Sequence, residues 1–78
     1  MINATLPELG ENVNEATISF FHFHAGDNVQ EGEDLVELTT DKAVFNLPAP
    51  GSGVLKEVFF EEGDVVKVWE IIATIEEP

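Results

Sequence analysis

The leading candidate for a chemically functional side chain is Lys42, one of only three Lys or Arg residues in this 78-residue chain. Folding the sequence about Asp41 and Lys42 brings Thr40 opposite Ala43 and predicts a β-hairpin. Period-two alternation then puts four apolar side chains on one face: Val36, Leu38, Phe45 and Leu47. An amine at such a tip projects from the sheet and is free for covalent modification. A solubilising charge on a turn is the simpler interpretation, and the surrounding sequence decides between the two.

The other reactive side chains offer weaker chemistry. His22 and His24 are two residues apart and share a strand face, yet no third ligand for zinc accompanies them. The acidic segments 31–34 and 61–62 fall in expected turns, where nothing indicates acid–base catalysis. Cysteine is absent, which excludes disulfides and a thiolate nucleophile. We therefore expect neither a metal site nor an enzyme active site.

The amino-acid composition limits the classes of partner that the chain can bind. Sixteen acidic and three basic residues give a formal charge of −13. This field repels nucleic acid and anionic membranes and favours basic protein partners, although it also simply confers solubility. The sequence has no apolar run of about 18 residues and no secretory signal pattern at its start. We expect one domain, near the lower size limit for an unassisted core.

An internal repeat predicts the architecture that positions Lys42. Residues 26–29 resemble residues 63–66, so equivalent positions are 63 − 26 = 37 residues apart. Short β-branched and aromatic segments between Gly-rich turns predict strands near 3–6, 17–23, 28–30, 35–39, 43–47, 54–60, 65–67 and 71–75. The expected fold is all-β: a flattened barrel-sandwich of two four-stranded antiparallel sheets with pseudo-twofold symmetry. That symmetry puts Lys42 at one end of the domain and the termini at the other.

The same pattern predicts the core and the special backbone positions. Gly26, Gly32 and Gly63 are expected in turns that need a positive φ, and a bulge is expected at Phe20–Phe21. The predicted core comprises Ile18, Phe21, Phe23, Val36, Leu38, Phe45, Leu47, Leu55, Val58, Phe60, Ile72 and Ile75.

Five motifs follow one another along the chain: Leu6-Pro7-Glu8-Leu9-Gly10-Glu11, Glu15-Ala16-Thr17-Ile18, Gly26-Asp27-x-Val29-x-x-Gly32-Glu33-x-Leu35, Thr40-Asp41-Lys42-Ala43 and Pro48-Ala49-Pro50. Their order is that seen in lipoyl domains, which the chain resembles over essentially its whole length. Those domains are the swinging-arm domains of acyltransferase subunits in 2-oxo acid dehydrogenase complexes.

The resemblance implies that the hairpin lysine is amide-linked to lipoic acid, and Lys42 matches that residue. Asp41 and Ala43 match its usual neighbours, while Gly26 and Gly53 match glycines sixteen residues before it and eleven after it. Asp41 either holds the turn through its side chain or marks the lysine for a ligase.

The resemblance also implies partners: a thiamin-diphosphate-dependent decarboxylase, an acyltransferase catalytic domain, dihydrolipoamide dehydrogenase, and a lipoate ligase or lipoyl transferase. Residues 1–78 then form a non-catalytic carrier domain, monomeric when isolated, that is excised from or N-terminal in a longer multidomain chain. We expect a cytoplasmic location in a bacterium or the mitochondrial matrix in a eukaryote.

The chain departs from the family at three places. Thr39 stands where glutamate is common, and His22 and His24 replace an apolar and a basic residue. Trp69 replaces a turn glycine; its ring either caps the core or forms a surface patch, and of the two we expect the core cap. There are two alternative functions for the chain, each with an argument against it. A biotinyl carrier has methionine on both sides of its lysine, and an unmodified docking module has no need of a projecting lysine.

Overall fold

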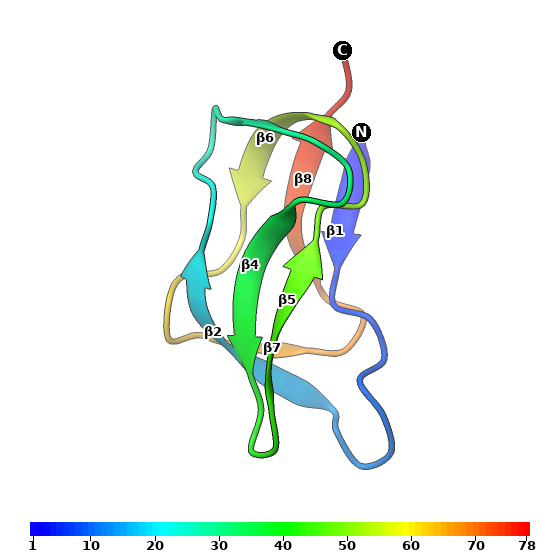
Figure 1. The fold of residues 1–78 in the computed structure, drawn as a ribbon, viewed down its shortest axis with the longest axis vertical. Helices are drawn as coiled ribbons and strands as arrows, with labels where there is room; N and C mark the ends of the chain where they lie inside the picture. Colours follow the sequence, from blue (N-terminus) through cyan, green and yellow to red (C-terminus); the bar gives the residue numbers. More distant parts are fainter.

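In a computed structural model of residues 1–78, eight strands form two four-stranded antiparallel sheets, as expected (Figure 1). One sheet has the order β1-β8-β6-β3, with the bounds Ile2–Thr5, Ile71–Glu76, Gly53–Val58 and Asn28–Val29. The other has the order β5-β4-β2-β7, with the bounds Val44–Pro48, Asp34–Thr39, Glu15–Phe21 and Val65–Lys67. The structure contains no helix that is long and apolar enough to cross a membrane.

Hydrogen bonds repeat along the chain at the predicted spacing of 37 residues. The Gly26 N–H donates to the Leu55 carbonyl at 2.7 Å, and the Gly63 N–H donates to the Ile18 carbonyl at 2.8 Å. Gly26 and Gly63 also share positive φ angles of 97° and 91°, which glycine adopts without strain. The two halves are thus one structural unit used twice.

The predicted strands 17–23 and 54–60 end two residues early, at Phe21 and Val58. The reason is a tight turn after each strand. The Asp27 carboxylate accepts the His24 N–H at 2.8 Å, and the Asp64 carboxylate accepts the Glu61 N–H at 2.8 Å. These side chains offer the backbone a local partner, so it leaves the ladder.

The hairpin between β4 and β5 has the predicted register, with Leu38 opposite Phe45 and Val36 opposite Leu47. The β2–β4 register shifts between Ile18 and Phe20, which places the bulge one residue earlier than predicted.

The side chains that fill the core are smaller than predicted. Seven of the predicted residues are buried, and five lie at the border, half-buried against the cluster: Phe21, Phe23, Phe45, Val58 and Phe60. Sequence reasoning missed eight buried residues: Ala4, Leu6, Ala16, Val29, Leu35, Ala49, Val66 and Ala73. Alanine and aliphatic side chains fill the narrow space between two facing sheets, whereas the bulkier rings pack around its edge.

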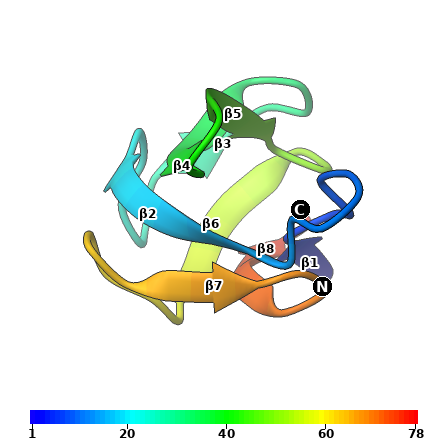
Figure 2. The ribbon, with the colours of Figure 1, turned by 90° about the horizontal axis from the view of Figure 1, so that it is seen from below.

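The molecule is elongated, with extents of 37 × 20 × 18 Å. Figure 1 shows both termini at one end of the long axis and the tip of the β4–β5 hairpin at the other. Figure 2 shows the two sheets from the hairpin end. The symmetry argument for the placement of the hairpin and the termini is therefore confirmed.

Candidate functional site

Thr40, Asp41, Lys42 and Ala43 form the tip of the β4–β5 hairpin. The Thr40 N–H donates to the Ala43 carbonyl at 2.8 Å, and the Thr40 hydroxyl lies 3.2 Å from the same oxygen. In return the Thr40 Oγ1 accepts the N–H of Ala43 at 3.1 Å and of Lys42 at 3.3 Å. One side chain therefore satisfies the polar groups of the turn and fixes its shape.

Lys42 is exposed at this tip, and its ammonium makes no ion pair or hydrogen bond. The other two lysines stand on strands. The Lys56 Nζ pairs with the Glu76 carboxylate at 3.1 Å, and Lys67 lies opposite Glu15 in the β2–β7 ladder. Lys42 is thus the one lysine that projects from a turn with an unengaged amine.

The neighbours of Lys42 leave space around it. Asp41 is exposed and its side chain takes no part in the hydrogen bonds of the turn, so the turn-holding role considered for it belongs to Thr40. Ala43 is exposed and small. An enzyme that encloses Lys42 therefore meets little obstruction, and Asp41 is available as a surface mark.

Gly26 and Gly53 match the family pattern but lie away from the tip. Gly26 forms the turn before β3, and Gly53 begins β6. A Cβ at position 53 would overlap the Glu76 carbonyl oxygen and come within 2.9 Å of the Ile75 Cγ2. These two glycines shape the scaffold, and the structure does not bring them to Lys42.

Sequence reasoning missed the connection between β1 and β2, which runs beside the hairpin (Figure 1). Leu9 and Val13 from this connection line an open groove together with Lys42, Ala43 and Phe45. The available signal was Leu9 and Val13, two apolar residues among the polar residues of segment 8–14. The lysine therefore stands beside an apolar surface built from two distant parts of the sequence.

Two of the departures from the family pattern have structural partners. The Thr39 hydroxyl hydrogen-bonds the Ser19 hydroxyl across the β2–β4 pair. The His22 Nε2 lies 2.8 Å from the Asn46 Oδ1, and its ring contacts Phe20 edge-on at a centroid distance of 4.8 Å. Polar side chains on β2 and β5 thus provide hydrogen-bond partners for Thr39 and His22.

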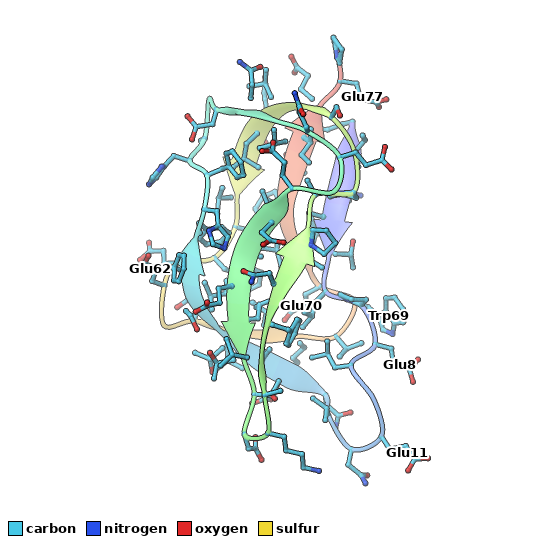
Figure 3. All side chains as sticks on the ribbon, viewed as in Figure 1. Glu8, Glu11, Glu62, Trp69, Glu70 and Glu77 are labelled. Carbon is cyan, nitrogen blue, oxygen red and sulfur yellow. The ribbon has the colours of Figure 1, made fainter.

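The prediction that Trp69 caps the core is wrong, because its side chain is 66% exposed. Trp69 has a φ of 74° and occupies the position equivalent to Gly32, whose φ is 90°. Its backbone N–H donates to the Leu6 carbonyl at 2.7 Å. Figure 3 shows its ring at the surface, near Glu8. The left-handed backbone directs the side chain outward, away from the sheet interior.

Comparisons with known proteins agree on the family. The biotin/lipoyl family model, described as "Biotin-requiring enzyme", matches residues 3–75. The chain is 48% identical over 77 residues to the dihydrolipoyllysine-residue succinyltransferase component of the Bacillus subtilis 2-oxoglutarate dehydrogenase complex. It is 40% identical over 73 residues to the dihydrolipoyllysine-residue acetyltransferase component of the Staphylococcus aureus pyruvate dehydrogenase complex.

These matches cover 99% and 94% of this chain but only 18% and 17% of the two relatives. Among solved structures, the lipoyl domain of the Azotobacter vinelandii 2-oxoglutarate dehydrogenase complex superposes with a TM-score of 0.80 at 30% identity. That alignment covers 99% of this chain and 98% of the other. The fold, the hairpin lysine and these matches together show that the chain belongs to the biotin/lipoyl family, as a lipoyl domain.

Proposed function

We propose that this chain is a swinging-arm carrier whose lipoic acid is joined by an amide bond to the Lys42 Nζ. The observation that carries the proposal is the unengaged Lys42 amine on a hydrogen-bonded hairpin tip, at the opposite end from both termini. A domain tethered through its termini holds such a lysine outward, where several partners reach it. Tethering also raises the effective concentration of the carried group at each partner.

The protein's part in the chemistry is presentation. Bound lipoic acid supplies a dithiolane that accepts an acyl group and electrons and passes them on. Thr40 holds the turn, Lys42 provides the attachment nitrogen, and exposed Ala43 leaves room for a modifying ligase. Amide formation removes the positive charge of Lys42, so the formal charge of −13 becomes more negative. An acidic surface steers the carrier toward basic patches on its partners.

The proposed setting is a 2-oxo acid dehydrogenase complex, in which the chain is one domain of a longer acyltransferase. The short coverage of the two relatives supports a multidomain parent. The partners are then a thiamin-diphosphate-dependent decarboxylase, the acyltransferase catalytic domain and dihydrolipoamide dehydrogenase. The domain itself carries the substrate and does not catalyse the reaction.

Intact-mass spectrometry tests the attachment. The chain is incubated with a lipoate ligase, lipoic acid and ATP, in parallel with Lys42→Arg and, as a matched control, Lys56→Arg. We expect one lipoyl increment that is lost in Lys42→Arg and kept in Lys56→Arg. An increment that survives Lys42→Arg, or no increment at all, would overturn the proposal. Modification by a biotin ligase in place of the lipoate ligase would favour the biotinyl carrier instead.

A further inference from the structure

The surface beside Lys42 contains an open groove of about 350 Å³, here named the Leu9 groove. Its lining comes from the β1–β2 connection and the β4–β5 hairpin: Glu8, Leu9, Val13, Thr40, Lys42, Ala43 and Phe45. Leu9 and Phe45 are half-buried and packed against the core cluster, so two walls of the groove are held by the fold. Its volume lies within the range of about 300–1,000 Å³ found for small-molecule sites.

A second, smaller depression also borders Lys42 and shares Val13 and Thr40 with the groove. Its volume is about 90 Å³, and beyond Thr40, Val13 and Lys42 its lining is polar: Asn12, Asn14, Glu15 and Asp41. Lys42 thus borders both an apolar groove and a polar depression. Of these two surfaces, only the apolar groove lets a hydrocarbon chain attached to Lys42 bury its apolar surface from water.

We propose that the lipoyl chain on Lys42 rests in the Leu9 groove, with its methylenes against Leu9, Val13 and Phe45. This inference rests on the proposed lipoylation of Lys42. The occupant is specified by the covalent link, because Lys42 itself lines the groove. The tether makes docking intramolecular, so weak apolar contacts suffice to populate it. Amidation also leaves the attachment point neutral, which removes the preference of the lysine end for open solvent.

Docking shields the dithiolane between encounters with partners. The free arm is then only a fraction of the population, and reaction at the sulfur atoms slows in proportion to that fraction. The chain contains no cysteine, so after reduction of the lipoyl group its dithiol is the only thiol that reacts with an alkylating reagent. Alkylation kinetics therefore report the free fraction directly.

The first experiment compares dithiol alkylation rates in three lipoylated, reduced proteins: wild type, Val13→Asn and Val65→Asn. Val65 is a matched control, since it is 48% exposed on β7 and does not line the groove. We expect Val13→Asn to react about three to ten times faster than wild type, as when the docked state is favoured roughly two- to ninefold. Val65→Asn is expected to react at the wild-type rate. Equal rates in all three proteins overturn the inference.

The second experiment needs no groove variant. Methyl resonances of Leu9 and Val13 are compared by NMR in the unmodified, Lys42-acetylated and Lys42-lipoylated chain. Acetylation removes the charge without adding the long chain, so we expect both residues to shift in the lipoylated form only. Shifts of the same size in the acetylated form, or none in either, contradict docking.

The two proposals fail in different ways. A mass increment on Lys42, without methyl shifts or protection of the dithiol from alkylation, supports the carrier function and contradicts docking in the Leu9 groove. The absence of any increment on Lys42 removes both, because the groove then has no tethered occupant.

Discussion

The Thr40 Oγ1 accepts the Ala43 N–H at 3.1 Å, while the Ala43 carbonyl receives the Thr40 N–H at 2.8 Å. This reciprocal pair closes the hairpin directly around Asp41 and Lys42. The turn is consequently held from its first residue, and both residues at its tip keep free side chains. The hairpin displays Lys42 without using Lys42 to stabilise itself.

Replacing Thr40 with valine tests this arrangement, since valine keeps the shape and removes the hydroxyl. We expect Thr40→Val to lower the free energy of unfolding by about 1 kcal/mol, the usual net value of a hydrogen bond. Lipoylation by the ligase is also expected to slow, because the tip loses its fixed shape. Thr40→Ser keeps the acceptor and should restore both properties. Urea unfolding and initial lipoylation rates measure them; a Thr40→Val protein equal to wild type in both would contradict the role.

Trp69 provides a second test, because it is exposed yet has a positive φ. Trp69→Gly relieves the backbone strain of about 1–3 kcal/mol, which offsets the lost contacts and the greater freedom of the unfolded chain. We expect the free energy of unfolding to change by less than about 1 kcal/mol. A packed tryptophan would instead cost about 3–5 kcal/mol on truncation. A loss in that range, measured by urea unfolding, is the outcome that would restore the core-capping interpretation.

Gly32 is the matched control for Trp69, since it occupies the equivalent turn with a φ of 90°. A Cβ at position 32 meets no atom within 4 Å. Gly32→Ala therefore measures only the cost of a positive φ for a residue with a Cβ. We expect it to destabilise the domain by about 1 kcal/mol or more.

Thr74 is buried, and its hydroxyl has no hydrogen-bond partner. Thr74→Val replaces that hydroxyl with a methyl group of similar size. We expect the free energy of unfolding to rise by about 1 kcal/mol, because the folded state no longer desolvates an unpaired polar group.

Thr39→Val is the contrasting variant, because the Thr39 hydroxyl bonds Ser19. There we expect a loss of about 1 kcal/mol. Thermal or urea unfolding of the two proteins side by side checks the opposite signs. Equal effects of the same sign would show that the two hydroxyls have equivalent environments.

The formal charge of −13 predicts an unusual response to salt. Repulsion among sixteen acidic groups destabilises the compact state, and added salt screens it. The favourable side-chain pair Lys56–Glu76 is half-exposed, so its loss in salt costs less than about 1 kcal/mol. We therefore expect the unfolding temperature to rise between 10 mM and 500 mM NaCl, concentrations that shorten the screening length from roughly 30 Å to less than 10 Å.

The control for the salt response is the double variant Glu61→Gln, Glu62→Gln, whose carboxylates are exposed and unpaired. It should be more stable than wild type at low salt and respond less to added salt. An unfolding temperature that falls with salt in both proteins would show that attractive pairs dominate the electrostatics.

The amino-acid sequence was sufficient to predict the eight strands, the register of the lysine hairpin and the end of the molecule that carries it. Alternation of apolar and polar residues fixes which side chains share a face, as for Leu38 and Phe45. The 37-residue repeat fixes the symmetry, and symmetry places Lys42 opposite the termini. These properties depend on residues close together in the chain or on a pattern that the chain states twice.

Contacts between residues far apart in the sequence depend on the whole folded chain. The Leu9 groove joins the β1–β2 connection to Phe45, and the exposure of Trp69 follows from the φ of its own turn. Leu6, Leu35 and several alanines also occupy the interior, because the space between the sheets admits only side chains that fit it. Hydrophobicity states which residues favour burial, but packing volume between distant strands decides which of them are buried.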